Sequence, residues 1–279
     1  MPTPNDRRNV EGERAGLPLR IQQIQEGLAT QRLGKKIHYF LNIDSTNSHA
    51  RELADRGAQE GEVVIAEKQT AGRGRLGREW ISPAYANLYC SVILRPKLPP
   101  VHAPQVTLMA AVALADAVAS FLPVAPAIKW PNDILVRGKK LAGILTESSC
   151  DSEHLEFVIL GIGVNLNYSE ERMPEAIRQR ATSLLIAGGK RVQREAFVRR
   201  LIQDLDRCYG ILEESGFTAL AQRWESRFGL RGRRVQVETL DGVILGSARG
   251  IDQDGALIVE GKDGALQRVV AGDVIPVED

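Results

Sequence analysis

Arginine and glycine alternate over residues 72–80, which read Gly-Arg-Gly-Arg-Leu-Gly-Arg-Glu-Trp. The glycines leave the backbone free to wrap around an anion, and the guanidinium groups of Arg73, Arg75 and Arg78 can each grip phosphate or carboxylate oxygens at two points. The segment lacks the Gly-x-x-x-x-Gly-Lys-Ser/Thr spacing of a P-loop. Taken alone, such a segment is more often a solvated flexible loop or a basic stretch that touches nucleic acid non-specifically.

Further candidate residues follow in three short segments. Residues 129–133 read Lys-Trp-Pro-Asn-Asp between two apolar runs, a composition that ordinary turn chemistry explains equally well. Lys140 stands at the start of the next apolar run. A lysine at the end of a hairpin is most often simply exposed to solvent. Residues 161–167 read Gly-Ile-Gly-Val-Asn-Leu-Asn, and glycine inside a strand usually marks a bulge or the close approach of a ligand. Asn165 is then either a satisfied core amide or a donor to a ligand.

Other chemistries find little support. No Gly-x-Ser-x-Gly elbow occurs, and no spacing suggests a metal site or a triad among His38, His49, His102 and His154. The cysteines are too far apart for a disulfide framework or a zinc site, which predicts reduced, packed thiols in a cytoplasmic protein: Cys90, Cys150 and Cys208.

Composition narrows the class of protein. The chain has 279 residues, 43% of them hydrophobic, and a formal net charge of +1. This length predicts about two domains with a real core, and a charge near zero argues against a protein whose main work is neutralising a nucleic-acid backbone. The N-terminus has no apolar segment, and the most apolar window, residues 106–122, is interrupted by Asp116 and Ser120. We therefore expect neither a signal peptide nor a membrane span.

The patterning around these motifs alternates strands and helices. We expect a polar tail with one short helix at residues 1–34, the helix falling within residues 19–33. Strands are expected at residues 37–43, 63–67, 88–94, 128–130, 134–136, 141–146 and 157–167. Helices are expected at about residues 46–58, 101–122, 195–212 and 218–228. Residues 35–230 would then form one α+β domain in which helices pack on a β-sheet.

The composition changes after Gly229. Short alternating runs are separated by Asp-Gly or Gly-Asp pairs at residues 241–242, 254–255, 263–264 and 272–273. Asp-Gly between such runs is a strong hairpin signal. Residues 231–279 are therefore predicted to form a small C-terminal all-β domain, either a barrel or a sandwich.

Five motifs together, in order and spacing, resemble the biotin protein ligases, the biotin–[acetyl-CoA-carboxylase] ligases. They are Ser45-Thr46-Asn47, residues 72–78, residues 129–133, Lys-Leu-Ala-Gly-Ile-Leu at residues 140–145 and Gly-Ile-Gly-Val-Asn at residues 161–165. One such motif can arise by chance, but five in order are hard to obtain otherwise. The resemblance covers about residues 37–277. It implies a catalytic domain with a mixed β-sheet at residues 35–230 and a small SH3-like β-barrel at residues 231–279.

The resemblance implies a reaction in two steps. Biotin and ATP give biotinyl-5′-AMP and pyrophosphate, and biotin then passes to one lysine of a biotin carboxyl carrier protein. The first step brings a carboxylate against an α-phosphate, and unit charges about 4 Å apart repel by roughly 4 kcal/mol at an effective dielectric constant near 20. Fixed cations and Mg²⁺ are therefore expected. The acceptor lysine attacks as a neutral amine, for which the sequence offers no obvious base.

The resemblance also implies a role for each candidate residue. Lys140, Arg73 and Arg75 would be catalytic, with Lys140 between the reacting carboxyl and phosphate oxygens. The implied biotin-binding residues are Ser45, Thr46, Asn47, Gln69, Gly72, Arg73, Arg75, Lys140, Gly143 and Gly161. The implied ATP-binding residues are Arg75, Arg78, Trp80, Asn132, Asp133, Lys140 and Asn165, with Trp80 stacking on adenine and Asp133 as the Mg²⁺ ligand.

Some members of this family carry an N-terminal helix-turn-helix domain and repress transcription. Only about 35 residues precede the catalytic region here, so we expect a ligase that binds no specific DNA and no membrane. The resemblance further implies that the protein can be a homodimer.

Three alternatives remain open. A lipoate or octanoate ligase or transferase of related fold is disfavoured by the combination of the arginine loop with Lys-Trp-Pro-Asn-Asp. A nucleic-acid-binding module that uses the basic loop and the terminal β domain is disfavoured by the near-zero net charge and the few aromatics. An inactive, biotin-responsive regulator is disfavoured because the cationic positions are intact.

Overall fold

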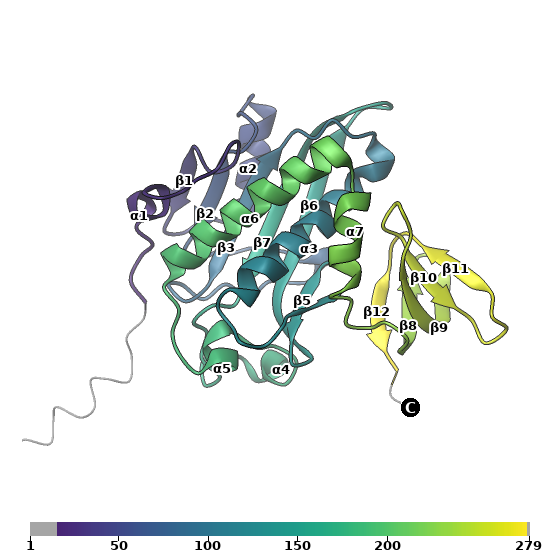
Figure 1. Ribbon diagram of the computed structural model, residues 1–279. Helices are drawn as coiled ribbons and strands as arrows, with labels where there is room; N and C mark the ends of the chain where they lie inside the picture. The colour runs from purple at the N-terminus through teal and green to yellow at the C-terminus, as the bar shows by residue number, and fades with distance from the viewer. Residues whose placement is uncertain (1–15, 278–279) are drawn as a thin grey trace, which may run out of the picture.

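The computed structural model describes residues 16–277, so nearly all of the tail expected at residues 1–16 lies outside the described residues. A seven-stranded sheet in the order β1-β2-β3-β7-β6-β5-β4 forms the larger part (Figure 1). Only β1 and β2 pair in parallel. The strands are β1 Ile37–Phe40, β2 Val63–Ala66, β3 Leu88–Leu94, β4 Ala127–Lys129, β5 Asp133–Val136, β6 Lys139–Cys150 and β7 Leu155–Val164.

Helices cover both faces of this sheet. The helices are α1 Ile21–Gln25, α2 Thr46–Asp55, α3 Ala103–Ala119, α4 Glu175–Arg178, α5 Leu184–Gly188, α6 Arg194–Ser215 and α7 Thr218–Glu225. α3, α6 and α7 pack on one face and form the main core with it (Figure 1). α2 packs on the other face, where Ala50 and Ala54 meet Val64, Ile93 and Phe157. The expected α+β architecture with a mixed sheet is therefore confirmed.

α3 is the central helix of the main core. Together with the short 3-10 turn before it, residues 100–119 are long and apolar enough to cross a membrane, but most of this stretch is buried inside the protein. The helix carries apolar residues all round because the sheet lies on one side and α6 and α7 on the other. Its sequence is thus that of a core helix.

The second sheet has five strands in the order β11-β10-β9-β8-β12, and every pairing is antiparallel. The strands are β8 Arg234–Thr239, β9 Gly242–Ile251, β10 Leu257–Glu260, β11 Leu266–Val269 and β12 Asp273–Pro276. The Asp-Gly turns are found where expected, with positive φ at Gly242, Gly255 and Gly264. Among the described residues no pairing joins β11 to β12, so the sheet does not close into the expected barrel.

Three other expectations differ from the structure. The helix expected within residues 19–33 is confined to α1, because the N–H groups of residues 31–33 instead donate to the carboxylate of Asp206 in α6. The short helices α4 and α5 were not predicted. Cys90 and Cys208 are buried thiols, but Cys150 is exposed at the end of β6 rather than packed.

Candidate active site

Residues 72–80 form a narrow loop that folds back on itself. The N–H of Gly74 donates to the carbonyl of Arg78 at 2.7 Å, and the N–H of Trp80 donates to the carbonyl of Gly72 at 2.9 Å. At the tip, Leu76 has a φ of 56° and its side chain is exposed. The chain reverses direction at this left-handed turn, so the arginines lie on both arms of one tight loop.

The three arginine side chains contact both sheets of the protein. Arg73 lies 3.3 Å from the carboxylate of Glu147 on β6. Arg75 donates to the carbonyl of Gly272 at 3.0 Å, and Arg78 lies 2.5 Å from the carboxylate of Asp273 at the start of β12. The C-terminal sheet therefore holds two of the loop's guanidinium groups.

The charges around Arg75 and Arg78 are coupled through Asp273. Burial lowers the pKa of Arg75, and the nearby carboxylates of Asp273 and Asp133 act against that shift. Hydrogen bonding to Asp273 raises the pKa of Arg78. Burial works to raise the pKa of Asp273, but contact with Arg78 and the charges of Lys129 and Arg75 hold it below its ordinary value. Arg75, Arg78 and Asp273 thus form one coupled group of charges.

A β-bulge directs Lys140 into this region. In the pairing of β5 with β6, Asp133 opposes Gly143, yet Leu135 opposes Lys140, so β6 contains one extra residue, Leu141. Without the bulge, the strict alternation of a strand would place Lys140 and Gly143 on opposite faces. With it, the Lys140 ammonium lies 2.7 Å from the Asp133 carboxylate. The lysine, the aspartate and the glycine therefore share one face of the sheet.

A buried polar network lies at the start of α2. Ser45 caps the helix by accepting from the N–H of Ser48. The N–H and the hydroxyl of Thr46 both donate to Oε1 of Gln69, at 2.9 and 3.0 Å. The Ser91 hydroxyl on β3 lies 2.8 Å from the Thr46 hydroxyl and 2.6 Å from Oδ1 of Asn47. These groups offer a set of fixed donors and acceptors of the kind that a polar ring system requires.

Asn47 ties this network to β6 and β7. Its amide nitrogen donates to the Glu147 carboxylate at 2.7 Å. A Cβ at Gly161 of β7 would lie 2.1 Å from Oδ1 of Asn47, so only glycine leaves room for the amide. The close approach expected at this glycine is therefore made by a side chain of the protein itself.

The two asparagines that the resemblance places near ATP, Asn132 and Asn165, differ in their hydrogen-bond partners. Asn132 donates to the carbonyl of Ile144 at 2.7 Å and accepts from Arg75 at 3.3 Å, so it lies at the edge of the arginine cluster. Asn165 is buried, donates to the carbonyl of Thr182 at 3.0 Å and accepts from Asn87 at 3.2 Å. Its amide thus has partners inside the protein and joins the end of β7 to neighbouring segments.

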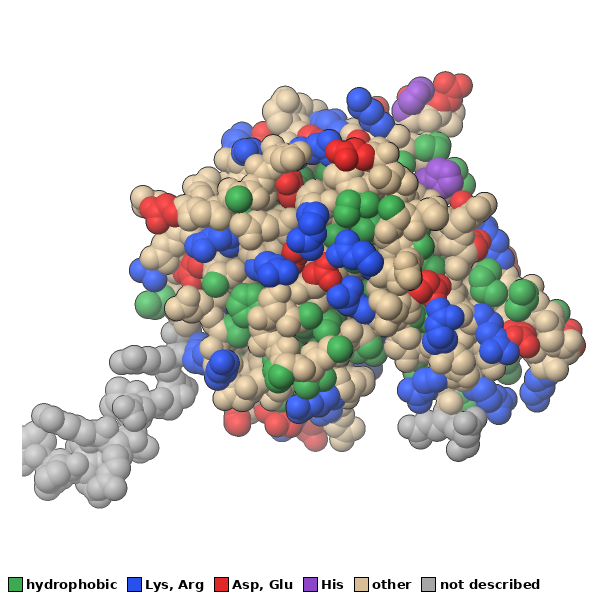
Figure 2. Space-filling model, in the orientation of Figure 1, with side chains coloured by type: hydrophobic (Ala, Val, Ile, Leu, Met, Phe, Trp, Pro, Cys, Tyr) green, Lys and Arg blue, Asp and Glu red, His purple; other side chains and the backbone are tan. Residues whose placement is uncertain are grey.

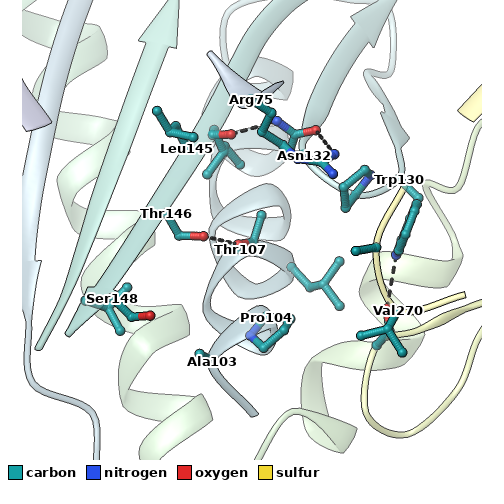
Figure 3. Close-up of a pocket in the computed structure, with 16 residues that line it drawn as sticks. Arg75, Ala103, Pro104, Thr107, Trp130, Asn132, Leu145, Thr146, Ser148 and Val270 are labelled. Atoms are coloured by element: carbon teal, nitrogen blue, oxygen red, sulfur yellow. Dashed lines mark hydrogen bonds between the residues drawn. The ribbon is translucent and has the colours of Figure 1, made fainter. Parts of the chain in front are cut away.

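Two cavities adjoin Arg75. One, of about 300 Å³, lies between the loop and β6 and is lined by Arg73, Gly74, Arg75, Leu76, Gly77, Leu145 and Glu147. The other, of about 270 Å³, lies between α3, β6 and the C-terminal sheet. Figure 3 shows this second cavity, with Arg75 and Asn132 at one end and the hydroxyl groups of Thr107 and Thr146, which lie 2.7 Å apart, facing one another.

Trp130 fixes the C-terminal sheet to the wall of the second cavity. Its ring is buried, and its Nε1 donates to the carbonyl of Gly255 at 3.0 Å. The Lys-Trp-Pro-Asn-Asp segment therefore contributes to the site and to the contact between the two sheets. Asn132 and Asp133 lie near Arg75, and Trp130 holds the second sheet.

The structure thus gathers the predicted residues into two adjacent groups. The cationic group contains Arg73, Arg75, Arg78, Lys140, Asn132, Asp133 and Trp80. The polar group contains Ser45, Thr46, Asn47, Gln69 and Gly161. Gly72 lies beside Gln69 and Trp80, and Gly143 beside Lys140 and Trp80. Asn165 stands apart, engaged with Asn87 and Thr182.

Sequence reasoning missed three residues of these groups. Ser91 is a serine in the buried strand β3, Glu147 is an acid within the partly buried strand β6, and Asp273 follows the Gly272 turn. Ser91 could have been noticed as a polar residue in an apolar strand, and Glu147 as an acid close after the apolar run at residues 141–145. Asp273 gave no signal, because its partner Arg78 lies 195 residues earlier in the chain.

Comparison with known proteins identifies both parts of the chain. Residues 39–165 match the model of the biotin/lipoate A/B protein ligase family, and residues 231–275 match the biotin protein ligase C terminal domain. A biotin–[acetyl-CoA-carboxylase] ligase of Mycobacterium tuberculosis is 40% identical over 273 residues, covering 95% of this chain and 98% of the relative. A bifunctional ligase/repressor BirA of Bacillus subtilis is 37% identical over 252 residues, covering 90% and 77%.

Solved structures agree with these sequence relatives. The biotin protein ligase from Aquifex aeolicus in complex with biotin and ATP superposes with a TM-score of 0.76 at 27% identity, covering 88% of this chain and 100% of that one. The sheet, the helices and the small second sheet described above are thus those of a known enzyme fold. The chain belongs to the biotin protein ligase family.

Proposed function

We infer that this protein is an ATP-dependent biotin–[acetyl-CoA-carboxylase] ligase. In the first step a biotin carboxylate oxygen attacks the α-phosphorus of ATP, the bond to the β-phosphate breaks, and pyrophosphate leaves. In the second step a lysine amine of the carrier protein attacks the carbonyl carbon of biotinyl-5′-AMP, AMP leaves, and the amine loses a proton. The observation that carries this inference is the convergence of four cations from one loop and one bulged strand, in a chain that belongs to this family.

The cations suit the first step because both reactants are anions. We propose that Arg73 and Arg75 bind the biotin carboxylate and the α-phosphate, that Arg78 binds the outer phosphates, and that Lys140 bridges the reacting oxygens. Fixed cations stabilise the charge that develops in the transition state without having to reorganise. Two observations support this assignment. Lys140 and Asp133 lie on the same face of the sheet, and Arg75 donates a hydrogen bond to Asn132 at 3.3 Å.

We propose that biotin is bound by the polar network at the start of α2. Ser45, Thr46, Asn47 and Gln69 present hydroxyl and amide groups suited to a ureido ring, while Gly161 leaves room for Asn47. The first cavity, between the loop and β6, is lined by Arg75 and by Glu147, which accepts a hydrogen bond from Asn47 of this network. A ligand that spans both groups would place its carboxylate among the arginines.

Mg²⁺ fits this site with a small protein donor set. No group of three or more His, Cys, Asp or Glu within residues 16–277 is placed to hold a metal ion. Mg²⁺ is commonly bound by one or two carboxylates together with substrate phosphates. We propose that Asp133 supplies the carboxylate and that Asn132 lies on the nucleotide side, where the metal would neutralise the leaving pyrophosphate. Asn165 would have to release Asn87 or Thr182 before its amide could contact the nucleotide.

Three further expectations remain proposals. The division into residues 35–230 and residues 231–279 would make the second unit a support for the arginine loop, which contacts Gly272 and Asp273. A cytoplasmic location agrees with the unpaired thiols of the described residues. The absence of specific DNA binding agrees with the interspersed acidic and basic side chains on the face drawn in Figure 2, and gel-shift assays would test it. The homodimer that the family resemblance implies is a separate proposal, which sedimentation equilibrium would test.

Calorimetry followed by a turnover assay tests the function. Biotin is titrated first, and ATP with Mg²⁺ is then added while pyrophosphate release is measured. We expect biotin to bind, pyrophosphate to appear only when biotin and ATP are both present, and a carrier-domain lysine to become biotinylated. Lipoate in place of biotin is the matched control. Pyrophosphate release with lipoate but not with biotin would overturn the inference, as would salt-sensitive RNA binding with no turnover.

A further inference from the structure

The indole of Trp80 packs against two glycines that lie side by side on adjacent strands of the main sheet. Gly143 of β6 and Gly163 of β7 are register partners. A Cβ at Gly163 would lie 2.5 Å from Cε2 of Trp80, and a Cβ at Gly143 would lie 3.1 Å from its Cζ3. The buried Nε1 of Trp80 meets no hydrogen-bond acceptor in the part of the chain that the structure describes. Packing on the glycines, rather than a hydrogen bond, therefore locates the ring.

The same seat holds the end of Lys140. A Cβ at Gly143 would lie 3.2 Å from Cε and 3.3 Å from Nζ of Lys140. The ammonium lies 5.5 Å from the centroid of the Trp80 ring, within the range of a cation–π interaction. It also lies 2.7 Å from the carboxylate of Asp133. The ammonium thus interacts with both an aromatic ring and a carboxylate.

We propose that Trp80 is a positioning residue for Lys140 in the adenylation step, an inference that rests on the proposed function. A lysine side chain has four rotatable bonds, and orienting it in advance removes part of the entropic barrier. Trp80 closes the arginine loop at residues 72–80, so seating the indole on Gly143 and Gly163 fixes the ammonium and one end of that loop together. Loop closure and orientation of the lysine are then a single event.

This role differs from stacking on adenine in what it predicts. A stacking ring contributes mainly to ATP binding, so its loss would raise KM for ATP and leave kcat little changed. A ring that orients the lysine acts on the chemical step, so its loss would lower kcat while KM changes little. Gly143 is placed to serve the second role, because its missing Cβ makes room for Lys140 as well as for the ring.

The kinetic test compares Trp80→Leu with Trp80→Phe. We expect W80L to lower kcat for biotin-dependent pyrophosphate release at least about tenfold, with KM for ATP within about threefold of the wild type. W80F, which keeps an aromatic face, should stay within about threefold on both constants. A normal kcat in W80L, or a raised KM for ATP at unchanged kcat, would overturn the proposal.

A glycine pair provides a second comparison. Gly143→Ala introduces a Cβ into the seat, and we expect it to lower kcat as W80L does. Gly210→Ala in α6 is its matched control, because a Cβ there meets nothing within 4 Å. Thermal melting of both variants shows whether they fold. Equal kcat in the two alanine variants would contradict the proposal.

An NMR measurement makes the test independent of turnover. In protein labelled with ¹³C-lysine, the ring current of Trp80 should shift the ε-methylene signal of Lys140 upfield, and the K140R variant identifies that signal. The shift should vanish in W80L and persist in W80F. If the wild type releases no pyrophosphate, the proposed function fails while this measurement still tests the ring–lysine contact; an unshifted signal in the wild type would overturn that contact.

Discussion

The contact between the arginine loop and the C-terminal sheet can be weakened by one conservative change. Asp273→Asn removes the carboxylate that lies 2.5 Å from Arg78 and keeps a side chain of nearly the same size. The Arg78 side chain is 62% exposed and that of Asp273 is 20% exposed, so the pair contributes about 0.5–1 kcal/mol, the upper half of the range for surface ion pairs. The loop should then open about two to five times more often in D273N.

Trypsin cleavage under native conditions measures this opening. Cleavage after Arg73, Arg75 and Arg78 reports the population of the open loop when closing is faster than cleavage. Asp241→Asn is the matched control, because it removes the same charge from an exposed turn of the same small sheet. We expect faster cleavage of the loop in D273N and no change in D241N. Equal cleavage rates in D273N and the wild type would refute the view that the second sheet holds the loop.

The pH dependence of the same effect has a definite sign. The pKa of Asp273 is lowered in the folded protein by Arg78, Lys129 and Arg75, although burial acts the other way. Its contribution is therefore fully present above the unfolded value of about 3.9 and is lost only as the pH falls through the lower folded value. The ratio of cleavage rates should be constant between about pH 6 and 8. A ratio that declines within this window would assign the effect to another group.

Three further changes test other parts of the site and fold. Lys140→Ala should slow adenylate formation about 10²- to 10³-fold in a pyrophosphate-release assay, while calorimetry still detects biotin. Gly161→Ala would place a Cβ 2.1 Å from Oδ1 of Asn47 and should raise the Kd for biotin about ten- to a hundredfold, because a buried amide loses its partners. The Glu62 pKa is lowered to about 2 because the hydrogen bond from His38 and other contacts outweigh burial. Glu62→Gln should therefore lower the free energy of unfolding by about 1–3 kcal/mol at neutral pH, a difference that shrinks in urea titrations as the pH falls from about 4.3 toward the folded value.

Much of the fold follows from local pattern. The strand expected at residues 88–94 is found without change as β3, and the helix expected at residues 195–212 lies within α6. Both have strong periodicity that agrees with their packing, since β3 is buried on both faces and α6 buries one stripe. The Asp-Gly turns likewise depend on the two residues that form them. Closure of the second sheet depends on whether its edge strands, β11 and β12, pair with each other, and nothing local encodes that.

The sequence predicted which residues belong to the site better than it predicted how their side chains are placed. Resemblance to a family brought Lys140 and Asp133 together, but only the register of β5 against β6 shows that a bulge at Leu141 turns the lysine to the same face. Glycines were expected to admit a ligand, whereas Gly161 and Gly163 admit Asn47 and Trp80. Such contacts depend on the final packing of distant segments, which single-sequence patterns do not contain.

The cations of the site differ in how strongly the protein already neutralises them. Three of the four face carboxylates, in the pairs Arg73–Glu147, Arg78–Asp273 and Lys140–Asp133. An incoming phosphate or carboxylate must share or displace these partners, so part of the gain from binding is offset. The net attraction of each such cation for a substrate anion is smaller than its charge suggests.

Arg75 is the exception, because its hydrogen bonds go to neutral oxygens, the amide of Asn132 and the carbonyl of Gly272. Of the three loop arginines it should therefore contribute most to holding the adenylate, since charge-assisted hydrogen bonds to an anion are stronger than those to neutral acceptors. We expect Arg75→Gly to release biotinyl-AMP faster than Arg73→Gly or Arg78→Gly. Rapid filtration of pre-formed adenylate, together with labelling of unrelated lysines by the leaked intermediate, measures this order. A release rate for Arg78→Gly equal to or above that of Arg75→Gly would show that direct neutralisation by a carboxylate does not rank these cations.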